Sequence, residues 1–560
     1  MGVPRFFLWL YKKYKSQKFI LSKDEIPIID SLLIDTNCLL HPQCFKILGQ
    51  NTKIKNNIEL ERMMIEECIS YLKFIIEFID AKKEVYIAID GVAPIAKIKQ
   101  QRQRRFSSVN KRKLDESLKR KHKKEIATFW NNSAITPGTE FMKKLTEEIT
   151  EFCNTYKTKV KIYFSTANTP GEGEHKLLQY IRKSNNDYKY VIYGLDADLI
   201  FLALAANKDN IFLLRESQEV KNLKKDVRET LSYISIDTLK LCIVNEIKDN
   251  LYDEFVDRKL NEISIIKDFI FICYFLGNDF LPHIPSIDIS CFDKKNINGL
   301  DLLLQAYCHT YDNLESYLIC DENDISYNTE FLQMFLEYLS TFEDQFFKIL
   351  YDTKKFHKKL NSEDAYEKEV YRIENLQFKI EDPIELGKDE NDEYKFRYYK
   401  KYYNSEVNQN EIVKYACYKY IEGLIWVAKY YFKDCPSWDW YYPFDHAPFI
   451  SDIADNFKRF NISDYKFELG KPLNPLEQLC CVLPPQSSFL LPQEMRWIMN
   501  NSNSELIHLY PIKFELDLLY KDKYWQAIPI LPDLDIQLVK KVILKYTKKN
   551  VIDNNVLEFN

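Results

Sequence analysis

The sequence predicts an α/β fold in which a mainly parallel sheet is flanked by helices, followed by a second, mainly helical region. Up to about residue 290, short apolar segments alternate with longer segments of helical periodicity. Such alternation is typical of parallel strands joined by right-handed helical crossovers. The chain has 560 residues, of which 46% are hydrophobic, so it can form two or three domains with a large core.

Four apolar segments are the predicted strands of the sheet. Each is a nearly continuous apolar run, which is typical of strands buried on both faces. They cover residues 31–37, 84–91, 159–166 and 190–198. A helix is predicted between the first two, at residues 58–81, where apolar residues recur with helical spacing.

Three regions are expected along the chain: 1–350, 351–395 and 396–560. The middle region is highly charged and has almost no apolar periodicity, so it is predicted to be a surface linker. The third region is apolar and rich in aromatic residues.

Composition narrows the class of protein and its compartment. The net charge of -5 gives no overall nucleic-acid signal, so such a site must come from local charge. The 13 cysteines are scattered without a C-x-x-C pair, which predicts a reducing compartment. No stretch approaches 18 consecutive apolar residues, and the first ten residues do not form a signal peptide. We expect the cytoplasm, with the nucleus, or a virion for a viral protein, as alternatives, and no membrane association.

Acidic residues follow the predicted strands at the point where each strand ends. They are Asp35 after the first strand, Asp90 after the second, Glu172 and Glu174 after the third, Asp196 and Asp198 after the fourth, and Asp279 at the end of a very apolar helix. The carboxyl ends of parallel strands meet at one edge of a sheet, so these acids are expected to converge there.

So many carboxylates at one edge would repel one another unless cations neutralise them. All-oxygen ligands suit Mg²⁺ or Mn²⁺. Two such ions can generate a hydroxide and stabilise an in-line phosphoryl displacement. The structural alternative is that the acids serve as helix caps or turn residues: Asp35 and Asp90 fit that alternative, and Glu172 and Glu174 also suit a helix N-terminus.

A basic helix is predicted after Asp90. From residue 97 to residue 124 there are 13 Lys and Arg residues against two acids. The residues at i, i+4, i+7 and i+8 on one face are Lys97, Gln101, Arg104 and Arg105. This face can hold a terminal phosphate, and the rest of the helix can follow a nucleic-acid backbone. The alternative is a solvated basic helix or a nuclear-localisation run at residues 111–113 and 119–124.

A series of longer motifs resembles the XRN family of 5′→3′ exoribonucleases over nearly the whole chain. In the first half they are MGVPRFF, DTNCLLH, AIDGVAPIAKIKQQRQRRF, ITPGTEFM, ANTPGEGEHK, GLDADLI and FLGNDFLPHIPSIDI. In the second half they are SWDWYYPFDHAPFISDI, PLEQLCCVLPP and YPIKFELDL. The chain looks like a compact form of the family, such as those of large DNA viruses or unicellular parasites, without long C-terminal modules or a zinc knuckle.

The resemblance implies a fold and residue roles. It implies a Rossmann-like sheet of the PIN and flap-nuclease type, with the second region packed around the active site. Region 1–350 would be the nuclease region, 351–395 a variable linker and 396–560 a second homology region. The seven acids match the family's metal ligands. Lys97, Gln101, Arg104 and Arg105 match its pocket for a 5′-monophosphate, and His41 matches the residue that packs on the first base. One of Trp438 and Trp440 matches an aromatic that grips the 5′ end, and core packing is expected for the other.

The implied activity is processive 5′→3′ hydrolysis of 5′-monophosphorylated, decapped RNA to mononucleotides by two Mg²⁺ ions, for which Mn²⁺ can substitute. A monomer is expected, with single-stranded RNA and a decapping enzyme as partners, and GVPRFF is expected to line the entrance. Two alternatives stay open: a flap-type or PIN-like endonuclease, and a catalytically inactive RNA-binding protein. The sequence departs from the family at Ile95, at Cys38 and at the pair Asp445 and His446.

Overall fold

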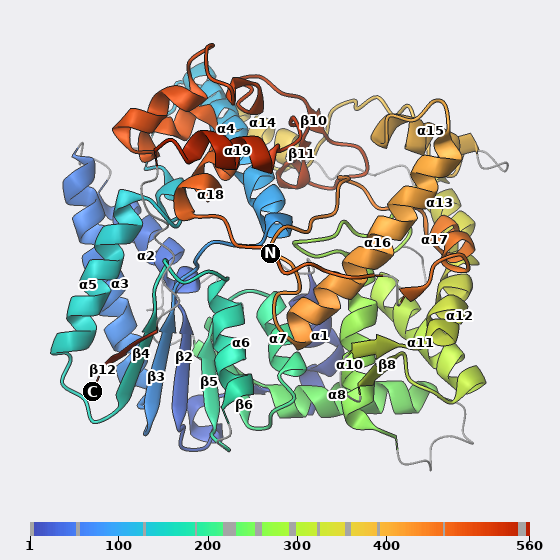
Figure 1. Cartoon of the computed structure of the whole chain (residues 1–560), viewed down its shortest axis with the longest axis horizontal. Helices are drawn as coiled ribbons and strands as arrows, with labels where there is room; N and C mark the ends of the chain where they lie inside the picture. Colours follow the sequence, from blue (N-terminus) through green and yellow to red (C-terminus); the bar gives the residue numbers. More distant parts are fainter. Residues whose placement is uncertain are drawn as a thin grey trace. The chain divides into compact units, whose positions relative to one another are not determined.

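The structure, a computed structural model, shows an α/β protein (Figure 1). It describes residues 5–51, 56–126, 130–184, 187–216, 231–251, 260–289, 298–321, 325–352, 360–388, 393–462, 465–546 and 556–559. The chain folds into two compact units, and each is built from three separate segments. Unit 1 is Met1–Ile29, Leu178–Lys355 and Pro383–Gly470, and unit 2 is Asp30–Leu177, Phe356–Asp382 and Lys471–Asn560.

The strands of unit 2 place three chain turns at one edge. β2 (Ser31–Asp35), β3 (Glu84–Ala88) and β4 (Lys161–Ser165) are parallel, and β12 (Leu557–Phe559) runs antiparallel to β4. Asp35 pairs with Ala88, and Ala88 pairs with Ser165. The three parallel strands therefore end in register, and the chain leaves all of them at the same edge.

Helices cover the strands of unit 2. α2 (Thr36–Gln50) packs on α3 (Asn57–Ile79), and α3 packs on α5 (Glu140–Thr155) (Figure 1). The apolar residues of α3 recur with helical spacing, so one face of this helix is buried. α6 begins at Gly173, directly after the turn that follows β4, and runs to Lys183.

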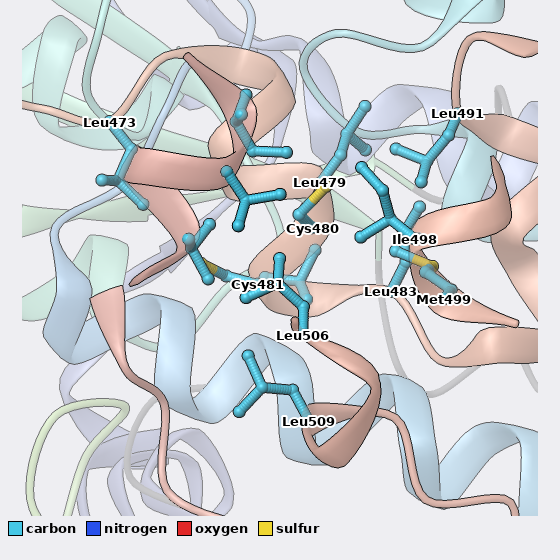
Figure 2. Packing of buried hydrophobic residues seen from close by; sticks show 14 of the residues in the cluster. Leu473, Leu479, Cys480, Cys481, Leu483, Leu491, Ile498, Met499, Leu506 and Leu509 are labelled. Carbon is cyan, nitrogen blue, oxygen red and sulfur yellow. The ribbon is translucent and has the colours of Figure 1, made fainter. Parts of the chain in front are cut away.

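The long helix α4 (Ile95–Lys121) joins the parallel strands to the C-terminal part of unit 2. α18 (Pro475–Val482) and α19 (Ile536–Ile543) pack with α4 around a shared apolar cluster (Figure 2). Ile98 of α4 is fully buried in this cluster. The buried Arg102 donates to the carbonyl oxygens of Pro532, at 2.5 Å, and Leu509, at 2.7 Å. These bonds satisfy a charged group that would otherwise be costly to bury.

Three smaller elements complete the described part of unit 2. α14 (Ala365–Glu374) lies beside α4 (Figure 1). β10 (Leu516–Asp517) and β11 (Ile528–Pro529) form a short antiparallel pair.

Unit 1 contains four further strands of mixed direction. Their order is β1 (Ile20–Leu21), β7 (Leu231–Ser235), β6 (Ile211–Glu216) and β5 (Tyr190–Tyr193). β5 and β6 are parallel, whereas β7 runs antiparallel to both of its neighbours.

Most of unit 1 is helical. Its helices are α1 (Phe6–Tyr14), α7 (Asp198–Ala205), α8 (Ile236–Asn250), α10 (Glu262–Cys273), α11 (Gly299–Leu314), α12 (Thr329–Ser340), α13 (Glu343–Asp352), α15 (Glu393–Tyr402), α16 (Gln409–Phe432) and α17 (Ile450–Phe457). A small hairpin joins β8 (Ile319–Asp321) to β9 (Ile325–Tyr327).

The predicted fold class, mainly parallel strands flanked by helices, is confirmed, with two differences in detail. The predicted strands end one to five residues earlier than expected, because the residues after them belong to turns and helix starts. The antiparallel strands β1, β7 and β12 and the parallel strand β6 were not predicted. β1 and β12 have only two and three residues, too few to show periodicity. None of the described helices is long and apolar enough to cross a membrane.

Candidate active site and nucleic-acid interface

Asp35 is fixed by the start of α2. It is the last residue of β2, and its side chain caps α2 by accepting the backbone N–H of Asn37 at 3.2 Å. Its other carboxylate oxygen accepts a hydrogen bond from the Cys38 thiol at 2.9 Å. The capping role that the sequence left open for Asp35 is therefore real, and it holds the carboxylate at the end of the strand.

Asp90 is held by two donors from different elements. It lies two residues beyond β3. Its Oδ2 accepts from the side-chain amide of Asn37 at 2.5 Å, and its Oδ1 accepts from the backbone N–H of Gly173 at 2.6 Å. Asn37 thus orients both Asp35 and Asp90, a role that sequence reasoning missed although Asn37 stands in the DTNCLLH motif.

Gly173 lies between the two carboxylates. A Cβ at this position would be 2.9 Å from Oδ1 of Asp35 and 3.3 Å from Oδ1 of Asp90, so a side chain would press against both. Glu172 and Glu174, both largely buried, flank this glycine in the sequence. The structure therefore brings the four predicted acids of unit 2 to the same edge of the strands.

Lys97 connects these acids to α4. Its ammonium group lies 2.5 Å from a carboxylate oxygen of Glu172, and both side chains are about nine-tenths buried. Lys97 is in the first turn of α4, which begins at Ile95. One ion pair therefore links the predicted phosphate-binding helix to the predicted metal ligands.

Lys176 is a second buried lysine at this edge, and sequence reasoning did not assign it a role. Its ammonium group donates to the carbonyl oxygens of Ile89, at 2.7 Å, and Thr166, at 3.0 Å. Burial lowers the pKa of Lys176 to about 7, and the charge of Asp90 opposes that shift. Lys176 ties together the turns that follow β3 and β4, and so supports the segment that carries Asp90.

The possible metal ligands at this edge are carboxylate oxygens, which suit a hard cation. Among the described residues, no three His, Cys, Asp or Glu side chains lie close enough together to hold a metal ion. The carboxylates are instead held by Lys97, Asn37 and the N–H of Gly173. Carboxylates crowded around a glycine form an all-oxygen donor set, and these residue types fit Mg²⁺ or Mn²⁺.

His41, Arg104 and Arg105 form a positively charged group within unit 2. Burial, and then the charges of Arg104 and Arg105, lower the pKa of His41 to about 4, so its ring is neutral near pH 7. Burial, and then Arg104, lower the pKa of Arg105 to about 9. Within the described part of the chain, Nη1 of Arg105 is buried without a hydrogen-bond partner. A buried guanidinium nitrogen without an acceptor indicates a place for an anionic ligand.

Gln101 lies on the same helix and is held from the C-terminal part of unit 2. Its carboxamide oxygen accepts from the side chain of Gln478 at 3.5 Å. Gln478, which is buried, also accepts the backbone N–H of Ala93 at 2.9 Å. The second homology region thereby positions the start of α4, a contact between residues nearly 400 positions apart.

The remaining three predicted acids lie in unit 1. Asp198 is the first residue of α7 and is buried, and its backbone N–H lies 3.5 Å from Oδ1 of Asp196. Asp279 is also buried. It stands in a tight turn where Oδ1 of Asn278 accepts the N–H groups of Phe280 and Leu281, each at 2.9 Å.

Gly277 makes this turn possible. Its φ is +81°, a conformation that favours glycine, and a Cβ there would lie 2.6 Å from the backbone nitrogen of His283. The glycine next to the predicted acid therefore sets the geometry of the Asp279 turn.

The two candidate tryptophans have different environments. Trp440 is buried, stacks on Trp426 with ring centroids 5.1 Å apart, and donates to Glu422 at 2.8 Å. The side chain of Trp438 is only half-buried. Trp440 is thus a core residue, and Trp438 is the more accessible ring.

Comparison with known proteins identifies the family of this chain. The family model described as "XRN 5'-3' exonuclease N-terminus" matches residues 1–217, and the model described as "Xrn1 helical domain" matches residues 259–369 and 348–552. The chain belongs to the XRN family. This confirms the predicted family.

Three relatives show how far the similarity extends. The chain is 31% identical to human 5'-3' exoribonuclease 1 over 96% of its own length and 33% of the relative's. It is 29% identical to Candida albicans 5'-3' exoribonuclease 2, over 96% of its own length and 71% of the relative's. Against Saccharomyces cerevisiae 5'-3' exoribonuclease 1 it is 28% identical, covering 98% of this chain and 43% of the relative. The chain thus spans about a third of the human XRN protein.

One predicted feature of the XRN resemblance falls partly outside the described residues. Residues 2–4 of GVPRFF, expected to line the entrance, are among those that the structure does not describe. Phe6 is fully buried and stacks on Phe201 of α7, with ring centroids 4.3 Å apart. This ring therefore belongs to the core of unit 1.

Proposed function

We propose that this chain is a metal-dependent, processive 5′→3′ exoribonuclease that acts on RNA with a 5′-monophosphate and releases mononucleotides. The observation that carries the proposal is the Arg105 guanidinium, whose Nη1 is buried without a partner among the described residues and which lies beside Arg104 and a neutral His41. An RNA substrate supplies the anion that this group requires, in the form of its terminal phosphate.

The 5′-phosphate pocket consists of Lys97, Gln101, Arg104 and Arg105. A guanidinium binds a phosphate through charge-assisted, partly bidentate hydrogen bonds, and these bonds are strongest where water is excluded. Lys97 is paired with Glu172, so it can turn from the carboxylate towards a phosphate without leaving the site. A pocket sized for one phosphate excludes a cap or a triphosphate, and a decapping enzyme is the partner that would supply the substrate.

Asp35, Asp90, Glu172 and Glu174 of unit 2, and Asp196, Asp198 and Asp279 of unit 1, are the proposed ligands for two Mg²⁺ ions. When bound, such ions lower the pKa of a water molecule and stabilise the charge on the attacking and leaving oxygens. The chain's own contribution is to hold the carboxylates: Asn37 and Gly173 fix Asp90, and Lys176 fixes the turns beside it.

The leading base stacks on His41, and Trp438 is the proposed second aromatic. A neutral imidazole suits stacking on any base, because a ring face does not read sequence. Trp440 is committed to Trp426 and Glu422, so its role is to support the segment that carries Trp438. We further propose a monomer acting in the cytoplasm.

One RNA sequence with four different 5′ ends tests the proposal. Wild-type protein is incubated in Mg²⁺ with 5′-monophosphate, 5′-hydroxyl, 5′-triphosphate and capped forms of an RNA labelled at the 3′ end. We expect degradation of the monophosphate form to mononucleotides and slow or absent degradation of the other three. Internal cleavage products would indicate an endonuclease instead, and binding without cleavage would indicate an inactive RNA-binding protein.

A further inference from the structure

The outer basic segment, residues 111–124, is covered by acids from α14. Asp364 is 2.6 Å from Lys124, Glu369 is 2.7 Å from Lys121, and Glu374 is 3.7 Å from Lys111. α14 therefore runs antiparallel to α4, with an acid of α14 opposite each of three α4 lysines. The region predicted to be a linker supplies this helix.

Further contacts join the two helices. Nε2 of His122 is 2.6 Å from the second oxygen of Glu369. The Tyr366 hydroxyl donates to Asp115 at 3.2 Å, and the ammonium group of Lys124 lies 5.7 Å from the Tyr366 ring. The rings of His122 and Tyr366 also meet edge to face, with centroids 5.9 Å apart, so the contacts between the two helices are mainly charged and polar, with one aromatic pair.

The inner part of α4 has a different environment. In the outer basic segment, carboxylates of α14 meet Lys111, Lys121 and Lys124. Asp115 and Glu116 of α4 itself meet Arg112, Lys119 and Arg120. In contrast, Nη1 of Arg105 is buried without a partner among the described residues. α4 thus has an inner part, in which Nη1 of Arg105 has no acceptor among the described residues, and an outer part, in which carboxylates of the protein neutralise most of the cations.

A polyanion can compete for the ion pairs that attach α14 to α4. None of the side chains of α14 is fully buried, and Tyr366, Val370, Tyr371 and Ile373 are only partly buried, so ion pairs with α4 form a large part of its attachment. The pairs that it makes are solvent-exposed ion pairs, which are individually weak and screened by salt. A nucleic-acid backbone competes for the same cations and gains from counterion release.

We propose that the outer basic segment is a binding surface for the RNA backbone, and that α14 occupies it as an internal polyanion which RNA must displace. The identity of the competing polyanion rests on the proposed function. In this arrangement α14 suppresses the binding of RNA through its backbone, because it occupies the lysines of the outer basic segment. Arg104 and Arg105, which α14 does not occupy, still bind the 5′ end of the RNA. Long RNA, with more phosphates, displaces α14 more readily than short RNA does.

The test removes the three acids of α14 that meet α4. The triple variant is Asp364→Asn, Glu369→Gln and Glu374→Gln. Asn keeps the helix cap that Asp364 provides, since Asn caps helices as well as Asp does. Binding of a 3′-labelled, 20-nucleotide RNA with a 5′-hydroxyl is measured by fluorescence anisotropy in EDTA, from 50 to 300 mM salt.

We expect the triple variant to bind this RNA about tenfold more tightly than wild type at 50 mM salt. The slope of log K against log salt should become steeper by about 2, because three more cations then meet phosphates of a single strand. A matched control carries the same charge change at exposed acids for which no contact with α4 is seen among the described residues: Glu147→Gln, Glu363→Gln and Glu381→Gln. This control should bind like wild type.

A second set of variants keeps the proposal falsifiable. Lys111→Gln, Lys121→Gln and Lys124→Gln should change wild-type binding little, and should abolish the gain when combined with the three α14 substitutions. Equal gain in the control variant, no gain in the triple variant, or a large loss from the lysine substitutions in wild type would each overturn the proposal. Cleavage of 5′-monophosphate RNA in Mg²⁺ is assayed in parallel. If the triple variant binds RNA more tightly but no protein cleaves it, the proposed function is refuted and this inference stands.

Discussion

The cationic side chains of α4 differ in what neutralises them. Lys97 is paired with Glu172, and Arg102 donates to two carbonyl oxygens. Both are therefore bound within the protein. Nη1 of Arg105 is buried without an acceptor among the described residues, and His41 beside it is neutral. Nη1 of Arg105 therefore requires an acceptor from a ligand, whereas the Arg102 guanidinium already has acceptors within the protein.

Replacing Arg104 and Arg105 by alanine should remove most of the preference for a 5′-monophosphate. Each charge-assisted bond to a buried phosphate contributes about 1.5–3 kcal/mol. Losing two should lower the ratio of kcat/KM for 5′-monophosphate and 5′-hydroxyl RNA by about two to four decades. The control is Lys113→Ala with Lys123→Ala. These two cations belong to the outer basic segment, and their loss should leave the ratio unchanged. An unchanged ratio in the arginine variant would remove both arginines from the pocket.

Asp196→Ala or Asp198→Ala should abolish hydrolysis and spare RNA binding. A lost metal ligand costs several kcal/mol of transition-state stabilisation, so kcat should fall by about three decades or more. Removing a negative charge does not weaken binding of a polyanion, so the affinity for RNA in EDTA should stay within about threefold of wild type. The exposed acid Asp187, changed to alanine, serves as the control. Near-normal turnover in Mg²⁺ by either variant would contradict the assignment.

At the scale of elements, buried side chains join segments that are distant in the sequence. Lys176 of α6 bonds the turns after β3 and β4, and Gln478 of α18 bonds the start of α4. In unit 1, Asp268 of α10 joins the helix to the β8 hairpin. These contacts decide how firmly the site-bearing turns are held.

Lys176→Met should destabilise unit 2. It removes the Lys176 donor from the carbonyl oxygen of Ile89, and leaves the carbonyl oxygen of Thr166 with the N–H of Thr169, so the cost is about 1–3 kcal/mol of unfolding free energy. Urea denaturation measures this cost. Lys183→Met, at an exposed position on the same helix, should change the free energy by less than about 0.5 kcal/mol. Equal effects of the two substitutions would show that the hydrogen bonds of Lys176 do not contribute to stability.

Asp268 should make unit 1 less stable as the pH rises through 7. Its carboxylate is fully buried and accepts from the Tyr307 hydroxyl and from the N–H groups of Leu318 and Ile319. Burial nevertheless raises its pKa to about 7 from an ordinary value of 3.8. The folded state therefore holds the proton more tightly, and the stabilisation is present below about pH 4 and lost as the pH rises through 7, by about 4 kcal/mol in all.

Asp268→Asn provides the pH-independent reference. The difference in unfolding free energy between wild type and this variant should narrow or reverse from pH 5 to pH 8, as measured by urea denaturation at each pH. Parallel curves for the two proteins would exclude a titration of Asp268 in this range.

At the scale of the whole molecule, activity should require Mg²⁺ or Mn²⁺. Ca²⁺ should support RNA binding without turnover, because its coordination is longer and looser than the compact octahedral geometry of Mg²⁺. Turnover of 5′-monophosphate RNA is measured after chelation and after each ion is added back, with RNA affinity measured in the same samples. Full activity in excess chelator would rule out the proposed metal ligands.

Much of the candidate site could be predicted from the sequence because its residues follow periodic elements. A buried strand is a continuous apolar run, and its end marks where Asp35 and Asp90 must lie. The spacing of Lys97, Arg104 and Arg105 marks one face of a helix, and α4 is that helix. The fold class and the family are confirmed, whereas the metal and phosphate roles stay predictions.

The roles of Lys176 and α14 could not be predicted, because they depend on which segments meet. A lysine in the first turns of a helix is expected in solvent, and only the turns packed around Lys176 bury it. The charged segment at 351–395 has no apolar periodicity, and α14 forms there with its acids opposite the lysines of α4.

Strand ends, helix faces and long motifs are local properties of the chain, so the class of fold, the family and the identities of the candidate ligands could be predicted from the sequence alone. Which of these residues are paired depends on how the segments pack in space. Burial left Nη1 of Arg105 without an acceptor within the described residues, joined Lys97 to Glu172, and placed Trp440 rather than Trp438 in the core. The physical reason is that desolvation and ion pairing depend on neighbours in space, which local periodicity does not specify.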